Sequence, residues 1–362
     1  MNHGGAVRTP DDGERHIPGQ TSRQHSLTRL IFFVRKRLPR SLAALVLSTV
    51  IALCLAEILV RTFDWDWDWT EASLYYQCLD LPLHEAVDNT ELLYRLRPNA
   101  RWVSGDYVVT INSLGFRGAD VTPEKPAGTY RIVVVGGSNV YGAAVRDEQT
   151  WPFRLEQELN RRHETQFEVL NMGVSGYVGS QMAATAKRAL KELDPDMILW
   201  AHSNVGMRPI LQGSDVRGYF RKHPELWFEL VIDPRLRTFP DKWELWAVEH
   251  WRFYRLALVA LTAKFGRRSY LAEHHNNKNE LITEKFVESL PDDIGIAVIV
   301  YPGIRMPVFV EDIDRKIGLP HYLLEYTGDD EKYLEIHPPA YVYEWYADNI
   351  ATWLEGNFDL PD

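Results

Sequence analysis

Hydrophobic residues in the middle of the chain alternate between short β-branched runs and longer segments with helical spacing. They predict a strand, helix, strand, helix, strand series over Arg131–Val135, Trp151–Arg161, Phe167–Leu170, Gln181–Leu193 and Met197–Ala201. Strands that alternate with helices in this way are typical of a parallel sheet covered by helices. We therefore predict an α/β fold with three layers, α/β/α.

The first of these helices shows why the pattern favours a helix. Trp151, Leu155 and Leu159 recur every fourth residue and therefore share one face. Thr150 is a candidate N-cap, and Pro152 suits a first turn, where its missing N–H is not needed.

A long insertion separates these elements from the C-terminal ones. We predict a buried strand over Ile294–Tyr301 and a closing helix over Pro338–Leu354, with a helical insertion over residues 205–293. Inside the insertion, Trp243–Phe265 is amphipathic and aromatic, but its uncharged part is too short to span a bilayer. That segment is either a lid over the site or a helix lying on the membrane surface.

The N-terminal region has a different pattern. Residues 1–40 are polar and end in a basic cluster, whereas residues 41–60 are apolar with Glu57 as the only charge. About 20 apolar residues are enough for a helix to cross a bilayer. By the positive-inside rule, residues 1–40 are cytoplasmic. We therefore predict a single-pass inner-membrane protein with a periplasmic or extracellular main domain.

Residues 61–129 form a lead-in segment that we expect to pack on the main domain, residues 130–362. The lead-in begins with Trp65, Trp67 and Trp69, which are candidates for an aromatic belt at the membrane surface.

Charge and cysteine content narrow the function classes. The formal net charge is −10, which argues against nucleic acid as a partner. The basic cluster at the end of residues 1–40 is explained by the predicted membrane topology. Of the two cysteines, Cys54 lies within the apolar run and Cys78 beyond it, so we expect no intrachain disulfide framework.

Residues able to do chemistry follow the ends of the predicted strands. Ser138 follows two glycines after the first strand, residues 171–179 follow the second, and Asn204 follows the third. The carboxyl ends of parallel strands meet at one edge of the sheet, where ligands bind. His337, just before the last helix, can reach the same edge. A hydroxyl, backbone N–H groups, an amide and an imidazole are the groups that acyl transfer needs.

Other kinds of site fit the sequence less well. The glycines before Ser138 lack the spacing of a dinucleotide-binding loop. Ser175 is a rival nucleophile, but Tyr177 stands where a nucleophile elbow has its second glycine. His274 and His275 lack ligand spacing on a defined helix, so we expect neither a metal nor a cofactor.

The same segments resemble the four sequence blocks of the SGNH/GDSL hydrolases. The blocks are residues 136–139, residues 171–177, Asn204 and residues 336–354. Gly115–Gly118 is similar to the lead-in of a membrane-anchored bacterial subgroup with a GGS-type nucleophile block. The resemblance implies a flavodoxin-like domain that hydrolyses or transfers esters, often acetyl or acyl groups on carbohydrate or lipid.

The resemblance also implies residue roles. Ser138 would be the nucleophile and His337 the base. The oxyanion hole would consist of the N–H groups of Ser138 and Gly176 and the side chain of Asn204.

One departure from the family pattern affects the base. The carboxylate that usually stands three residues before the histidine is Leu334 here, and Glu335 is the nearest substitute. A base without an orienting acid loses control of its tautomer.

Two function classes therefore stay open. The first is a membrane-tethered extracytoplasmic serine esterase or acyltransferase acting on an O-acyl group, above all O-acetyl, of an envelope glycan or lipid. The second is a catalytically inactive SGNH-like domain that binds such a polymer or a partner protein. A membrane protein is a further candidate partner.

Overall fold

The computed structural model describes residues 40–73, 83–202, 216–266, 281–301, 318–324, 326 and 337–362. The chain divides into two compact units, Met1–Thr62 and Phe63–Asp362. In the first unit, helix α2 (Arg40–Phe63) runs three residues beyond the predicted apolar run. Its segment Ser41–Phe63 is long and apolar enough to cross a membrane. Apolar side chains cover its surface, and Leu45 and Leu47 are each 61% exposed.

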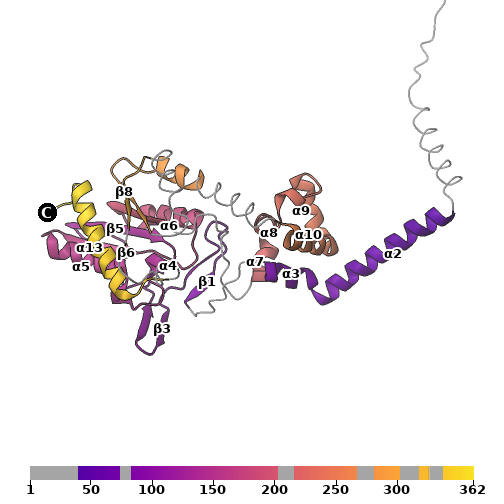
Figure 1. Cartoon of the computed structure of the whole chain (residues 1–362), viewed down its shortest axis with the longest axis horizontal. Helices are drawn as coiled ribbons and strands as arrows, with labels where there is room; N and C mark the ends of the chain where they lie inside the picture. Colours follow the sequence, from indigo (N-terminus) through magenta and orange to yellow (C-terminus); the bar gives the residue numbers. More distant parts are fainter. Residues whose placement is uncertain are drawn as a thin grey trace, which may run out of the picture. The chain divides into compact units, whose positions relative to one another are not determined.

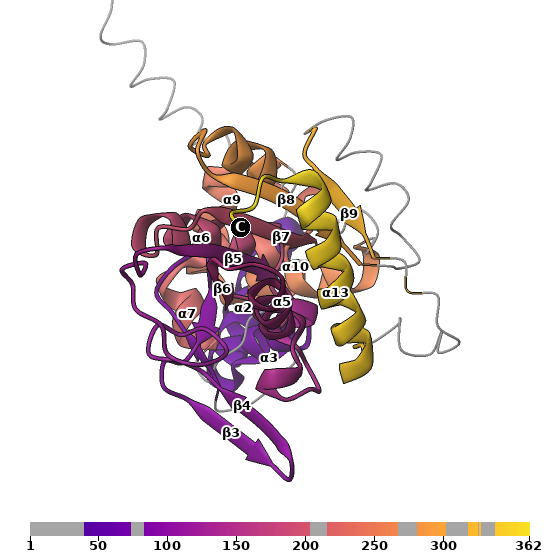
Figure 2. The same cartoon turned by 90° about the vertical axis from the view of Figure 1, so that its left-hand side faces the viewer.

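A parallel sheet of five strands forms the centre of the second unit, in the order β6-β5-β7-β8-β9 (Figures 1 and 2). Its strands are β5 (Thr129–Gly136), β6 (Gln166–Asn171), β7 (Met197–His202), β8 (Gly295–Val300) and β9 (His321–Leu323). This order is that of flavodoxin-like folds, so the predicted α/β class is confirmed. The edge strand β9 was not predicted, because three residues are too few to show a pattern.

Alternate residues of β5 face two separate cores. Ile132 and Val134 pack with α5 (Trp151–Arg162) and α13 (Ala340–Asn357). On the other face, Val133 and Val135 pack with α6 (Gly179–Glu192). Helices α5 and α13 lie side by side (Figure 2). A strand buried on both faces is apolar at every position, which explains the continuous β-branched run. The three predicted layers are therefore present.

Helix α5 confirms its predicted apolar face. Trp151, Leu155 and Leu159 are all fully buried, and Pro152 lies in the first turn. Thr150 occupies the N-cap position, as predicted, but its side chain makes no capping hydrogen bond. Its hydroxyl instead donates to the Asp147 carbonyl at 3.0 Å, because the 3-10 turn η1 (Asp147–Gln149) brings that acceptor close.

The lead-in segment contains two antiparallel hairpins. They consist of β1 (His84–Ala86) with β2 (Tyr94–Leu96) and of β3 (Arg101–Ser104) with β4 (Tyr107–Thr110). The Tyr94 hydroxyl donates to the Ser175 carbonyl at 2.6 Å, and the Tyr177 hydroxyl donates to the Tyr94 carbonyl at 2.6 Å. The lead-in is thus bound to the loop that follows β6.

The described part of the insertion is helical. It comprises α7 (Val216–Lys222), α8 (Pro224–Val231), the 3-10 turn η2 (Pro234–Leu236), α9 (Asp241–His250), α10 (Arg252–Phe265) and a helix over residues 281–288. The aromatic segment that was predicted as one stretch is two helices. They are separated at Trp251, whose backbone is extended with φ −115° and ψ 97°.

Helix α3 (Trp65–Ser73) corrects one prediction about the aromatic belt. Trp65 and Trp69 are 43% and 48% exposed, but Trp67 is only 3% exposed. The Arg255 guanidinium lies 4.4 Å from the centre of the Trp67 ring. Trp67 therefore belongs to the protein core rather than to a membrane-facing surface.

Candidate active site

Ser138 begins the short helix α4 (Ser138–Tyr141) directly beyond the end of β5. Gly136 allows this tight connection, because a Cβ atom there would lie 2.3 Å from the Val140 side chain and 3.0 Å from the Ala201 carbonyl oxygen. Ser138 itself is half-buried. Strand β6 lies on one side of β5, and the next strand along the chain, β7, lies on its other side. The direction in which strands are added therefore reverses at β5, and ligands bind at such a switch point.

The loop after β6 is bound to the same edge. The Val174 N–H donates to the Gly136 carbonyl at 3.1 Å. Gly173 fits only as glycine, since a Cβ atom would lie 2.4 Å from the Tyr141 nitrogen. Gly176, two residues beyond Val174, has a φ of 82°, in the left-handed region that favours glycine. The structure thus holds the loops of Ser138 and Gly176 at one edge of the sheet.

Arg117 holds the C-terminal end of α4. Its Nη1 donates to the carbonyls of Tyr141 and Gly142, each at 2.6 Å, and its Nη2 donates to that of Val145 at 2.6 Å. The Asp147 carboxylate accepts from Nε at 2.8 Å. With 4% exposure, this guanidinium is buried under the helix that carries Ser138.

Asn171, which pairs with Arg117 in an antiparallel bridge, supports the same helix. Its Nδ2 donates to the Val140 carbonyl at 2.8 Å, and its Oδ1 accepts from the Gly173 N–H at 3.1 Å. The sequence analysis assigned no role to Arg117 or Asn171. The only indication in the sequence was that each residue lies in a segment that resembles the SGNH/GDSL hydrolases.

His337 lies just before α13 and is half-buried. Burial lowers the pKa of its imidazole below the usual value and so favours the neutral form that a general base requires. Val342 and Tyr343 of α13 belong to the same core as Val140 of α4. The first turn of α13 and the serine helix therefore contribute to the same hydrophobic core.

Two predicted site residues, Asn204 and Glu335, lie outside the described residues, and so do Leu334, Cys78 and the pair His274 and His275. Strand β7 ends at His202, so Asn204 follows the strand by two residues along the chain. The roles predicted for Ser138, His337, Gly176, Asn204 and Glu335 remain predictions.

The rival nucleophile Ser175 is buried, with 6% exposure, and its carbonyl accepts the Tyr94 hydroxyl. Ser138, which is half-buried, is therefore the more accessible of the two serines. Within the described ranges, no group of three or more His, Cys, Asp or Glu side chains lies close enough together to hold a metal.

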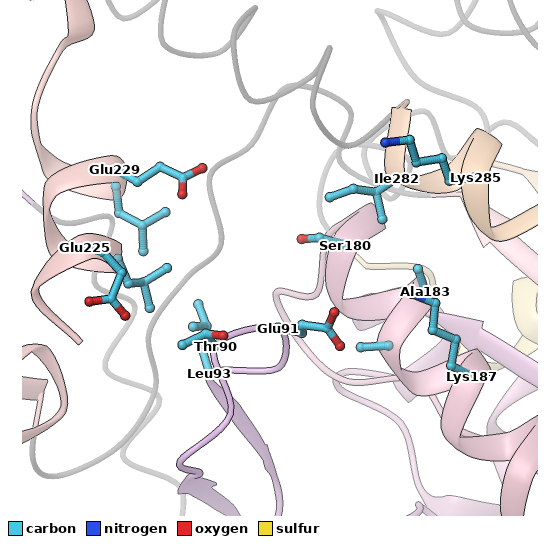
Figure 3. Close-up of a pocket in the computed structure, with 13 residues that line it drawn as sticks. Thr90, Glu91, Leu93, Ser180, Ala183, Lys187, Glu225, Glu229, Ile282 and Lys285 are labelled. Atoms are coloured by element: carbon cyan, nitrogen blue, oxygen red, sulfur yellow. The ribbon is translucent and has the colours of Figure 1, made fainter. Parts of the chain in front are cut away.

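A cavity of about 420 Å³ lies apart from these residues, between α6, α8, residues 90–93 and the helix over residues 281–288. Figure 3 shows Glu225 and Glu229 on one side and Lys187 and Lys285 on the other. Ser180 is the lining residue nearest in sequence to Gly176. Neither Ser138 nor His337 lines the cavity.

Comparison with known proteins finds similarity only among solved structures. No family model matches the chain, and no curated protein matches it. A two-domain esterase active on acetylated mannans shares 13% identity, with a TM-score of 0.35 over 64% of this chain and 50% of that one. The chain thus spans half of that esterase.

Two other esterase structures are similar over nearly their full length. A carbohydrate acetylesterase family member from Sinorhizobium meliloti shares 12% identity, with a TM-score of 0.33 over 63% of this chain and 99% of that one. An SGNH-hydrolase family esterase shares 14% identity, with a TM-score of 0.21 over 65% of this chain and 100% of that one. Sequence identities and TM-scores this low do not by themselves establish the fold of this chain. The α/β/α fold stands on the strand order and register of the sheet.

Proposed function

We propose that the chain is a membrane-tethered, extracytoplasmic serine esterase or acyltransferase. Its substrate is an O-acyl group, above all O-acetyl, of an envelope glycan or lipid. The observation that carries the proposal is the position of Ser138 at the switch point of the sheet. The hydrogen bond from the Val174 N–H to the Gly136 carbonyl holds the loop that contains Gly176 beside it. A strand end that presents a hydroxyl beside backbone N–H groups suits attack on an acyl carbon.

In the proposed reaction, the Ser138 Oγ attacks the ester carbonyl carbon and His337 takes its proton. The carbonyl oxygen becomes an oxyanion that accepts hydrogen bonds from the N–H groups of Ser138 and Gly176 and from the Asn204 amide. The intermediate collapses, and the alcohol leaves with the proton from His337. Water or a sugar hydroxyl then attacks the acyl-enzyme, which gives hydrolysis or transfer.

Glu335 is proposed to orient His337 by accepting a hydrogen bond from the ring nitrogen that faces away from Ser138. Glu335→Gln should then lower kcat far more than it changes KM, because orienting the base acts on the transition state.

The proposed tether is α2. Support comes from its apolar surface and from the basic residues that precede it, which favour a cytoplasmic N-terminus by the positive-inside rule. The main domain would then act on the outer side of the inner membrane.

Labelling with a serine-directed fluorophosphonate tests the proposal on the full chain in detergent, together with hydrolysis of 4-nitrophenyl acetate. We expect the wild type and Ser175→Ala to label and to turn over the ester, and Ser138→Ala to do neither. Labelling that survives in Ser138→Ala would contradict the proposed nucleophile.

A non-catalytic SGNH-like domain is the second candidate function, and Leu334 in the place of the usual acid is the observation that favours it. A folded wild type that neither labels nor cleaves acetyl esters, yet retains an acetylated glycan or a partner protein, would establish this alternative.

A further inference from the structure

Exposed tryptophans are concentrated in one part of the described structure. They are Trp65 (43% exposed), Trp69 (48%), Trp243 (65%), Trp246 (45%) and Trp251 (54%). All lie in α3, in α9 or in the single residue that joins α9 to α10, and we call these three helices the tryptophan lobe. Trp151 and Trp200 of the sheet domain are only 0% and 2% exposed. Apolar side chains left exposed together mark a surface that binds something.

The tryptophan lobe is held together by a buried ion cluster. The Asp66 carboxylate of α3 is 0% exposed and accepts from Arg252 Nη2 at 2.6 Å and from Arg255 Nε at 2.7 Å, both on α10. Arg252 also pairs with Asp64. Helix α10 is therefore fixed to α3, and α9 packs on α10.

The exposed rings gather on single helix faces. Trp65 and Trp69 are four residues apart on α3, and Trp243 and Trp246 are three apart on α9, so each pair shares a face. The Trp246 and Trp251 rings meet edge to face with their centres 6.0 Å apart. The α9 face thus continues to the start of α10.

Chain connectivity decides which partner fits this surface. Only Asp64 separates the end of α2 at Phe63 from the start of α3 at Trp65. Since one residue spans at most about 3.6 Å, α3 starts at the membrane surface if α2 crosses the bilayer. Tryptophan is enriched at that surface, because its ring is apolar and its N–H is polar.

We propose that the tryptophan lobe is a second membrane contact, in which Trp243, Trp246 and Trp251 insert into the headgroup region of the bilayer that α2 crosses. This inference rests on the proposed membrane tether. A helix with aromatic residues on one face binds a bilayer in this way without spanning it. Two contacts, in place of one helical tether, would restrict rotation of the catalytic domain about α2.

Site-directed spin labelling of the full chain in phosphatidylcholine and phosphatidylglycerol vesicles tests the proposal. The reporters are Trp243→Cys and Glu249→Cys in a Cys54→Ser, Cys78→Ser background. Glu249 is exposed one turn beyond Trp246, and its substitution keeps every tryptophan. Val103→Cys, at an exposed site on the β3–β4 hairpin, is the matched control. Native Cys54 in a Cys78→Ser background reports on α2.

Collision rates with oxygen and with a water-soluble nickel complex give the depth of each label. We expect labels at 243 and 249 to shift toward oxygen relative to 103, and the label at 54 to shift further. Water-like labels at 243 and 249 together with a lipid-like label at 54 would overturn the second contact and leave the tether intact. The same conclusion would hold if adding an acetylated glycan then lowered the collision rates at 243 and 249. Labels at 243 and 249 shielded from both reagents would also overturn it, since protein would then cover the surface. A water-like label at 54 would overturn the tether and this inference with it, whereas serine reactivity would be unaffected.

Discussion

A serine hydroxyl becomes a useful nucleophile only when its position is fixed, so at the scale of residues the supports of α4 matter most. Arg117 binds three carbonyl oxygens at the end of that helix, and Asn171 binds a fourth, that of Val140. Neither side chain is proposed to touch substrate. If Ser138 is the nucleophile, as proposed, both are positioning residues for it.

Arg117→Lys should slow ester hydrolysis through misplacement of Ser138. An ammonium cannot reproduce the planar fork that reaches Tyr141, Gly142 and Val145 together. A displacement of about 1 Å costs about 10²-fold in rate, so we expect kcat to fall by that order and KM to change little. Steady-state kinetics on an acetyl ester would measure this effect. Arg188→Lys is the control, because Arg188 donates to Leu114 of the lead-in without binding α4. Equal losses of kcat in both variants would show that the rate depends on the lead-in segment as a whole and not on the contacts of Arg117 with α4.

The pH dependence of kcat/KM should report His337. Burial lowers the pKa of its imidazole from the usual value of about 6.5, and only the neutral ring accepts the serine proton. The midpoint of the acid limb should therefore lie below the pH of about 6.5 expected for an unperturbed histidine. An acid limb centred at or above neutral pH would contradict the assignment.

His84 should make folding sensitive to acid. Its side chain is 5% exposed, neither ring nitrogen has a hydrogen-bond partner within the described residues, and burial lowers its pKa to about 4. Because the folded pKa lies below the unfolded value, stability is full above about pH 6.5 and is lost as the pH falls toward 4. The loss should approach about 3 kcal/mol at about 1.4 kcal/mol per pKa unit.

Urea unfolding of the full chain in detergent as a function of pH would measure this loss. His84→Phe keeps the ring contacts with Tyr94 and Tyr141 and should flatten the profile. His250→Gln, which alters an exposed histidine and leaves His84 in place, is the control variant. A steep acid dependence that persists in His84→Phe would assign the titration to another group.

At the scale of elements, α3 shows how a helix can hide part of a pattern that looks uniform in sequence. Aspartate and tryptophan alternate from Asp64 to Trp69, yet the helix turns Asp66 and Trp67 inward and leaves Trp65 and Trp69 outside. The inward pair meets Arg252 and Arg255 from α10.

Asp66→Asn should weaken the packing of α3 on α10. Removing one partner of a buried ion cluster leaves uncompensated charge, which typically costs about 3–5 kcal/mol. Asp68→Asn is the matched control, because Asp68 pairs with Arg217 at 2.9 Å on a surface where its side chain is 56% exposed. Its loss should be below about 1 kcal/mol. Hydrogen exchange of α3 and α10 would measure both, and similar protection in the two variants would show that the cluster does not hold the lobe.

At the scale of the whole molecule, the proposed orientation in the membrane rests on the charge on either side of α2. In a Cys54→Ser background, Cys78 should react with a membrane-impermeant maleimide in spheroplasts. Ser22→Cys, placed in a Cys54→Ser, Cys78→Ser background, should not react until the membrane is broken, because the proposed orientation puts the basic tail in the cytoplasm. The reverse pattern would overturn the orientation and leave the esterase chemistry untouched.

The sequence by itself determined the α/β class and most elements of the sheet domain. Strand β5 and helix α5 are recognisable because the period of their buried positions is local, as in Ile132–Val135 and in Trp151, Leu155 and Leu159. The order of chemical groups along the chain also identified Ser138 and His337 as candidates, since the end of the first strand and the start of the last helix are visible in sequence.

Only the tertiary structure decided what these elements contact. Arg117 reaches Val145 across 28 residues of sequence, and Arg252 reaches Asp66 across 186. No local period encodes a partner at such a separation, so neither the support of the serine helix nor the burial of Trp67 could be predicted. Strand β9 was missed for a related reason. Its three residues gain their strand structure by pairing with β8, which the chain brings together only in the folded state.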